Sequence, residues 1–305
     1  MLPKRLAKGD TVGIIAPAGP PDPDELNKGI RFLQSLGLKV KLGQHCNNVY
    51  GYLAGTDEER LYDLHDMFAD PNVQAIICAR GGYGTGRIAQ HINYELIADN
   101  PKIFWGYSDI TYLHTAIRQQ TGLVTFHGPM VSSDIGGEHF DSLSKRMFEQ
   151  MFEPRRIVYS EKIAPIDIIT PGDARGEIVG GNLTLLVSTL GTPYELGTAN
   201  KLLLLEDIGE EPNRVDAMLN QLRLAGKFDE AAGVILGNFS DGEPSGKKPS
   251  FTLQQVFHQY FSSYPKPVVS GLQIGHCLPN IAIPLGTIAN LSTTTKTLTI
   301  NPGVW

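Results

Sequence analysis

The first half of the chain alternates short apolar runs with segments of helical period, and this alternation limits the folds that the chain can adopt. Residues 11–16, 73–79 and 103–107 are short and almost wholly apolar, as expected of strands that are buried on both faces. Residues 24–36 carry apolar side chains at helical spacing, and residues 56–59 have the spacing of a capping box. Strands and helices in alternation predict an open parallel sheet with right-handed crossovers.

The pattern changes near residue 150, which predicts two domains. Residues 1–150 are expected to form an N-terminal α/β domain with an open parallel sheet of the flavodoxin or Rossmann type. Residues 151–170 hold prolines and arginines without a clear period and are expected to be a linker. Residues 171–305 contain more strand-like segments, so they predict a β-rich α/β C-terminal domain.

Composition excludes several classes of partner. Lys plus Arg number 26 against 32 for Asp plus Glu, and the resulting net charge of −6 argues against a nucleic-acid partner. No apolar run approaches the length that spans a bilayer, so no membrane partner is expected. Three cysteines without a CxxC pair indicate a reducing, cytoplasmic location rather than a disulfide framework. No His-Glu-x-x-His or comparable cluster is present, so neither a metal nor a cofactor is predicted.

Ser108 is the first candidate for chemistry. It follows an apolar strand and Gly106, and a segment of helical period comes after it. A serine on such a strand-to-helix turn can expose its hydroxyl as a nucleophile, or it can simply cap the helix. The G-x-S-x-G pattern is incomplete, because Ile110 stands where the second glycine would be. The residues alone leave both interpretations open.

A glycine-rich turn at residues 80–87 follows the strand that ends at residue 79. Its backbone N–H groups, including those of Gly81 and Gly82, could hold a phosphate or an oxyanion, or the segment could be a plain tight turn. The spacing is not G-x-G-x-x-G, which disfavours a dinucleotide. Arg80 and Arg87 flank the glycines and are candidates either for binding a terminal carboxylate or for surface ion pairs.

Glu206 and His276 are the candidates in the second half. Glu206 ends a buried apolar strand, where a carboxylate is either solvated at the rim of the sheet or placed to orient a base. His276 lies between Gly275 and Cys277 in a loop, a position typical of catalytic residues and also of ordinary hydrogen-bonded histidines. Taken together, the candidates supply a nucleophile, a base, an orienting carboxylate and a loop of amide donors.

Motifs along nearly the whole chain resemble those of the LD-carboxypeptidase family of serine peptidases, which includes the microcin C immunity peptidases. The matching segments are residues 9–17, 52–57, 80–84, 106–111, 126–130, 180–183, 205–207 and 275–276. The resemblance implies a Ser-His-Glu triad of Ser108, His276 and Glu206. It also implies an oxyanion hole formed by the backbone amides of Asp109, Gly81 and Gly82.

The same resemblance implies a substrate and a cellular role. The expected substrate is the murein tetrapeptide, cut between the L-centre of its third residue and the terminal D-Ala. The expected setting is cell-wall recycling in the bacterial cytoplasm, by a homodimer.

Two other functions stay open at this point. The immunity relatives hydrolyse peptidyl-nucleotides and would need an aromatic surface for the base, whereas Tyr159 is the only aromatic residue from 155 to 174. A non-catalytic module that binds peptides or sugars would explain the fold, but not the joint presence of Ser108, Glu206 and His276.

Overall fold

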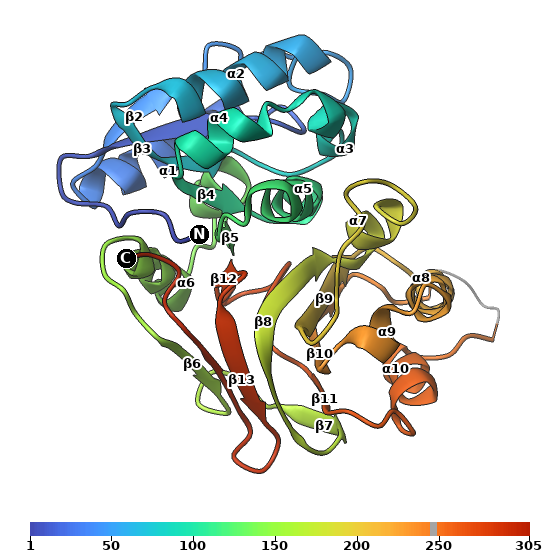
Figure 1. Ribbon diagram of the computed structural model, residues 1–305. Helices are drawn as coiled ribbons and strands as arrows, with labels where there is room; N and C mark the ends of the chain where they lie inside the picture. Colours follow the sequence, from blue (N-terminus) through green and yellow to red (C-terminus); the bar gives the residue numbers. More distant parts are fainter. Residues whose placement is uncertain (245–248) are drawn as a thin grey trace. The chain divides into compact units, whose positions relative to one another are not determined.

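The computed structural model describes residues 1–244 and 249–305, which divide into two compact units. Unit 1 comprises Met1–Arg155, Ile281–Gly286 and Pro302–Trp305. Unit 2 comprises Arg156–Asn280 and Thr287–Asn301. Within the described residues, unit 1 holds a six-stranded sheet and unit 2 an eight-stranded sheet. The predicted architecture, an open parallel sheet followed by a β-rich α/β part, is confirmed (Figure 1).

The sheet of unit 1 has the strand order β12-β5-β4-β3-β1-β2. Its strands are β1 (Thr11–Ile15), β2 (Lys39–Leu42), β3 (Val73–Cys78), β4 (Ile103–Gly106), β5 (Thr125–His127) and β12 (Ile283–Leu285). β1 to β5 are parallel, and β12 pairs with β5 in the antiparallel sense. In an open sheet of this order the ligand site lies beyond the carboxyl ends of the strands, near β1 and β3, where the chain direction around the sheet reverses.

Helices pack on both faces of this sheet, because its strands alternate apolar side chains between two cores. The α-helices are α1 (Pro23–Ser35), α2 (Asp57–Ala69), α3 (Thr85–Ile88), α4 (Tyr94–Asp99), α5 (Thr111–Thr121) and α6 (Ser142–Arg146). Short 3₁₀ or π turns are η1 (Ala89–His91), η2 (Ser108–Ile110), η3 (Val131–Ile135) and η4 (Met147–Met151). On β3, Ile77 faces the core beneath α1, and Ile76 faces the core beneath α2 and α5. The predicted capping box at Thr56 and Glu59 is present and starts α2.

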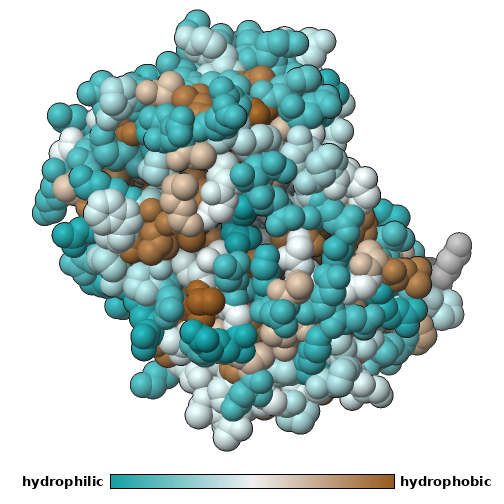
Figure 2. Space-filling model, in the orientation of Figure 1, coloured by the Kyte–Doolittle hydropathy of each residue, from teal (hydrophilic) through white to brown (hydrophobic). Residues whose placement is uncertain are grey.

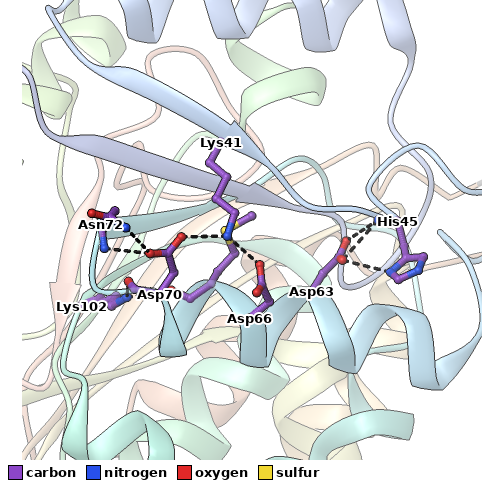
Figure 3. A network of polar contacts seen from close by, with 8 residues as sticks. Lys41, His45, Asp63, Asp66, Asp70, Asn72 and Lys102 are labelled. Carbon is purple, nitrogen blue, oxygen red and sulfur yellow. Dashed lines mark hydrogen bonds and ion pairs between the residues drawn. The ribbon is translucent and has the colours of Figure 1, made fainter.

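A polar network joins β2 to the end of α2 (Figure 3). Lys41 Nζ on β2 donates to Asp66 Oδ2 at 2.7 Å and to Asp70 Oδ2 at 2.9 Å. Lys102 Nζ donates to the carbonyl of Met67 at 2.8 Å and to that of Asp70, so it satisfies carbonyls that the last turn of α2 leaves free. The network therefore holds the C-terminal end of α2 against the sheet.

The sheet of unit 2 has the order β6-β14-β13-β8-β9-β10-β11-β7. Its strands are β6 (Ile157–Ser160), β7 (Asp167–Thr170), β8 (Asp173–Asn182), β9 (Leu202–Ile208), β10 (Gly233–Ser240), β11 (Val268–Ser270), β13 (Ile288–Ser292) and β14 (Thr297–Ile300). Its helices are α7 (Leu183–Ser188), α8 (Pro212–Leu224), α9 (Lys227–Glu230) and α10 (Leu253–Phe261). β8 to β11 are parallel, so the carboxyl end of β9 lies at the same edge as that of β10.

The division into units departs from the expected domain boundaries in two places. Residues 151–170, expected to be a linker, contain β6 and β7, which form both edges of the sheet of unit 2. Residues 281–286 carry β12, which completes the sheet of unit 1 instead of staying with the C-terminal part. Both departures arise from strand pairing between residues that are distant in sequence, which local composition does not report.

Within residues 1–244 and 249–305, no helix is both long and apolar enough to span a membrane.

Candidate active site

Ser108 lies on a strained turn between β4 and α5. Its φ is 64°, in the left-handed region that residues other than glycine rarely occupy. In the described structure the N-termini of η2 and α5 have no side-chain cap, so the hydroxyl of Ser108 does not act as a helix cap. The strain turns the serine out of the regular helix, as on the strand-to-helix turns that present nucleophiles.

The glycine-rich turn after β3 packs directly against this serine. A Cβ atom built on Gly81 would lie 2.8 Å from Ser108 Cβ and 2.9 Å from Ser108 Oγ, so only glycine fits there. The same position lies 3.5 Å from the backbone nitrogen of Asp109. Gly82 has a φ of 118°, which also favours glycine. The backbone at Gly81 therefore lies directly against the side chain of Ser108 and close to the amide of Asp109.

The side chain of Asp109 joins the turn at Ser108 to the glycine turn. The carboxylate is buried and accepts a hydrogen bond from Thr85 N at 2.9 Å, while Thr85 Oγ1 donates to the carbonyl of Asp109 at 2.6 Å. Burial raises the pKa of Asp109, and the hydrogen bonds from Thr85 act in the opposite direction. The sequence predicts a role only for the backbone amide of Asp109, because the partner of its carboxylate lies 24 residues away.

Arg60 on α2 donates hydrogen bonds to two loops at this edge of the sheet. Its guanidinium is buried, and Nη1 donates to the carbonyl of Gly84 at 3.0 Å and to that of Pro17, while Nη2 pairs with Asp57. Gly19 N donates to Gly81 O at 3.0 Å, which joins the loop after β1 to the loop after β3. A buried arginine in the first turn of a helix gives no sequence signal of this kind, because its acceptors include carbonyls of distant loops.

The two flanking arginines have different surroundings. Arg87 donates through Nε and Nη2 to both carboxylate oxygens of Asp57, at 2.9–3.1 Å, so it forms a bidentate ion pair. Arg80 donates through Nη1 to the carbonyl of Pro20 at 3.2 Å, and its side chain is exposed. Arg80 therefore keeps more of its donors available to a ligand than Arg87 does.

Two exposed tyrosines, Tyr52 and Tyr83, lie beside the glycine turn, and neither was among the residues predicted from the sequence. The rings of Tyr52 and Tyr83 meet edge to face, with centroids 5.6 Å apart. The backbone of Tyr52 lies close to Gly19, in the loop that bonds to Gly81. Large exposed aromatic side chains at the carboxyl edge of a parallel sheet are the signal that could have identified them.

In unit 2, Glu206 and His276 form a hydrogen-bonded pair. Glu206, on β9, is fully buried, and its Oε2 lies 2.8 Å from His276 Nδ1. Burial raises the pKa of Glu206, and the hydrogen bonds and charge of His276 oppose that rise. With the carboxylate ionised, Nδ1 carries the hydrogen and Nε2 is left as the basic nitrogen. The buried pair therefore has the arrangement in which a carboxylate orients a basic histidine.

Gly275 makes this pairing possible. A Cβ atom on Gly275 would lie 2.3 Å from Glu206 Oε2, and the φ of Gly275 is 113°. Gly275 N also donates to Asn280 Oδ1 at 3.3 Å, which fixes the loop that carries His276. The glycine before the histidine is therefore required both by space and by backbone conformation.

The neighbouring Asp207 has a separate, structural role. Its carboxylate accepts from Asn182 Nδ2 at 2.8 Å, and from Thr184 N at 2.9 Å and Thr184 Oγ1 at 2.8 Å. These bonds hold the turn between β8 and α7 against the end of β9. Of the adjacent acidic residues on β9, only Glu206 contacts a histidine in the described part of the chain.

Tyr159 does not offer an aromatic surface. It is buried, and its hydroxyl accepts a hydrogen bond from Gln273 N at 2.8 Å. Its ring is therefore part of the interior of unit 2.

The structure thus brings some predicted residues together within each unit. In unit 1 it gathers Ser108, Gly81 and Asp109, and in unit 2 it pairs Glu206 with His276. A strained serine beside a glycine turn, and a histidine held by a buried carboxylate, are the parts from which serine hydrolases are built.

Comparison with known proteins identifies the family. Residues 12–128 match the LD-carboxypeptidase N-terminal domain, and residues 175–291 match the LD-carboxypeptidase C-terminal domain. The chain belongs to the LD-carboxypeptidase family, and it is a serine-type carboxypeptidase.

Individual relatives agree over nearly the full length. The chain is 54% identical to a probable murein peptide carboxypeptidase of Bacillus subtilis, over 99% of this chain and 95% of that protein. The crystal structure of muramoyltetrapeptide carboxypeptidase from Oxalobacter formigenes is 30% identical, with a TM-score of 0.86 over 97% of this chain and 99% of that one. A microcin C7 self-immunity protein in complex with aspartyl sulfamoyl adenosine is 25% identical, with a TM-score of 0.89 over 99% and 98% of the two chains.

Proposed function

We propose that this chain releases the terminal D-Ala from murein tetrapeptide by cutting the bond between the L-centre of the third residue and D-Ala. The strained Ser108 turn, packed against Gly81, carries the proposal. The 54% identity to a probable murein peptide carboxypeptidase supports the substrate class. The proposed triad is Ser108 as nucleophile, His276 as general base and Glu206 as the residue that orients His276.

The proposed mechanism is acyl transfer through an acyl-enzyme. His276 Nε2 takes the proton of Ser108 as Oγ attacks the carbonyl of the third residue, and Glu206 stabilises the imidazolium that forms. The oxyanion of the tetrahedral intermediate accepts hydrogen bonds from the amides of Asp109, Gly81 and Gly82. Loss of one such donor typically costs about 2.7–4 kcal/mol of transition-state stabilisation. His276 then protonates the departing D-Ala amine, and water, activated by the same base, releases the shortened peptide.

An exopeptidase must also bind the terminal carboxylate of its substrate, and we assign this role to Arg80. Arg87 is the weaker candidate, because both oxygens of Asp57 already engage it. Arg80→Ala should raise KM for tetrapeptide about tenfold or more with little change in kcat, since it removes a charge-assisted bond made in the ground state. Arg87→Ala is the matched control, with KM within about twofold of the parent. An unchanged KM in Arg80→Ala would remove the assignment.

The cellular setting is proposed on the same basis. Hydrolysis of free murein peptides belongs to cell-wall recycling, and we place it in the cytoplasm because of the three cysteines without a disulfide framework. We also propose a homodimer, which sedimentation equilibrium would test directly.

Replacement of the nucleophile tests the central assignment. Ser108→Ala should lower kcat/KM for D-Ala release by about 10⁴-fold or more, because the remaining residues cannot form an acyl-enzyme. The measurement is free D-Ala from defined stem peptides that end in D-Ala or in L-Ala, with only the former cleaved. Ser35→Ala, at an exposed serine of α1, serves as the control with parental activity.

Two further observations would contradict the proposal. One is retained D-Ala release by Ser108→Ala with unchanged circular dichroism. The other is a fluorophosphonate adduct that mass spectrometry locates on a serine other than Ser108.

Hydrolysis of aminoacyl-nucleotides is the second candidate, favoured by the similarity to the immunity protein solved with aspartyl sulfamoyl adenosine. The ring of Tyr159 is buried and cannot stack on a base, so that position supplies no aromatic surface for a nucleotide. A competition assay decides between the two: tetrapeptide should be consumed first, and aspartyl sulfamoyl adenosine should inhibit only weakly.

A further inference from the structure

A cavity lies on unit 1, formed by segments that carry none of the proposed catalytic residues. Its volume is about 720 Å³, within the range of small-molecule sites. Three stretches of chain line it: the N-terminal segment, the C-terminal end of α1, and α6 with the residues that follow. The lining residues are Arg5, Leu6, Ala7, Lys8, Phe32, Leu36, Lys145, Arg146, Glu149, Phe152, Glu153 and Arg155.

The floor of the cavity is apolar and rigidly supported. Phe32, Leu36 and Phe152 are half-buried and pack against the core beneath α1. The ring of Phe32 meets that of Phe148 edge to face, with centroids 5.5 Å apart. Leu6 N donates to Met151 O at 2.7 Å, which fixes the N-terminal wall. Figure 2 shows that apolar, brown patches interrupt the hydrophilic surface on this face of the molecule.

The rim of the cavity is positively charged in a protein whose net charge is −6. The two acidic lining residues, Glu149 and Glu153, both pair with Arg155, which offsets one of their two charges. Four further exposed cations line the cavity, namely Arg5, Lys8, Lys145 and Arg146, so that cations outnumber acidic groups there by five to two. In the part of the chain that the structure describes, none of the four has an acidic partner.

The helix dipole accounts for the position of only two of the four cations. Lys145 and Arg146 lie in the last turn of α6, where a cation stabilises the helix dipole, and Lys145 Nζ also lies 5.7 Å from the ring centroid of Phe140. Arg5 and Lys8 come from a different segment that is not helical. Four like charges around an apolar hollow repel one another, and a bound anion would relieve that repulsion.

We propose that this cavity binds a soluble small molecule that combines an anionic group with a flat apolar body. The cations take the anionic group, whereas Phe32, Leu36 and Phe152 contact the apolar body. A hollow of about 720 Å³ that three segments line has the size of a small-molecule site, which is far smaller than the broad contact that a lipid surface would make.

The probe for this site is 1-anilinonaphthalene-8-sulfonate, which has both features. Fluorescence titration and calorimetry should give saturable binding of one probe per chain. The double variant Lys145→Glu/Arg146→Glu should weaken binding about tenfold or more, because two attractions become repulsions. The matched control is Lys28→Glu/Lys39→Glu, two exposed lysines outside the cavity, with affinity within about twofold of the parent.

Two ligand controls separate the charge from the apolar body. The neutral analogue N-phenyl-1-naphthylamine should bind about tenfold more weakly than the sulfonate, and inorganic sulfate alone should not displace the probe. Both double variants, Lys145→Glu/Arg146→Glu and Lys28→Glu/Lys39→Glu, should release D-Ala at the parental rate, which verifies that they fold.

Several results would overturn the proposal. Equal affinity of the parent and the Lys145/Arg146 variant, or equal affinity for the neutral analogue, would remove the anion site. Binding of the parent to phosphatidylglycerol vesicles that is lost in the variant would make the cavity a membrane contact. A change of oligomeric state in the variant, without ligand, would make it an interface between copies of this chain.

Discussion

At the scale of single residues, the proposed chemistry depends on two positive φ angles. Ser108 adopts a φ of 64° although it bears a side chain, and Gly275 adopts 113° beside the carboxylate of Glu206. The first conformation is strained and turns a hydroxyl toward the glycine turn. The second is free of strain only because glycine has no Cβ. Both positions set the direction of a neighbouring functional group, so their effect on catalysis should exceed their effect on stability.

Gly275→Ala tests this at the histidine loop. The added Cβ would lie 2.3 Å from Glu206 Oε2, so the loop must move and His276 with it. A displacement of about 1 Å should lower kcat/KM about a hundredfold. Gly209→Ala is the control, since its φ of 74° is also positive but nothing lies within 4 Å of the new Cβ.

Both glycine variants should lose about 1–2 kcal/mol of unfolding free energy, because each forces alanine into the left-handed region. Urea denaturation measures that loss, and D-Ala release measures the activity. Equal activities of the two variants would show that Gly275 serves only the backbone and not the Glu206–His276 pair.

At the scale of elements, the network between β2 and α2 supports the face of the sheet rather than the chemistry. Lys41 bonds Asp66 and Asp70 (Figure 3), and the pKa of Asp70 is lowered to about 2, chiefly by the hydrogen bond from Lys41 and next by that from Asn72. A carboxyl whose pKa is lower in the folded state stabilises that state above its ordinary value of 3.8. That stabilisation is lost as the pH falls from 3.8 toward 2.

Lys41→Met should therefore lower the unfolding free energy by about 1 kcal/mol near neutral pH, since the two ion pairs are partly exposed. The difference from the parent should shrink as the pH falls toward the pKa of Asp70. Urea denaturation over a pH series measures both effects. Lys39→Met, at an exposed lysine of the same strand, is the control. A difference that stays constant with pH would exclude Asp70 as the partner that matters.

At the scale of the whole molecule, the units are not consecutive pieces of chain. Unit 1 also includes two segments from the end of the chain, Ile281–Gly286 and Pro302–Trp305. The first of them carries β12, which pairs with β5. A Cβ on Gly128 would lie 2.5 Å from Ala282 Cβ, and one on Gly303 would lie 2.6 Å from the ring of Phe126. The returning segments therefore cover the β5 side of the sheet closely.

A fragment of residues 1–155 should not fold to a stable monomer. Without β12, strand β5 becomes an open edge next to uncovered aromatic side chains, which favours aggregation. Sedimentation and amide exchange measure the outcome. The same fragment with residues 279–305 attached through a flexible linker is the control and should be more protected. A stable, monomeric 1–155 would contradict the structural role of β12.

The sequence by itself determined whatever depends on neighbours a few residues apart. The alternation of strands and helices, the capping box of α2 and the chemical types of Ser108, Glu206 and His276 were all readable, because periodicity and capping act within one or two turns. The family motifs added the proposed triad.

Only the tertiary structure decided which distant residues meet. The 2.8 Å contact between Glu206 and His276 joins residues 70 positions apart, and Asp109 reaches the turn at Thr85 from the next strand. The return of β12 to the first sheet left no local signal in the sequence. The same holds in the second sheet for the pairing of β6 with β14 and of β7 with β11. Strand partners and buried hydrogen bonds are chosen by the packing free energy of the whole chain, which no short segment contains.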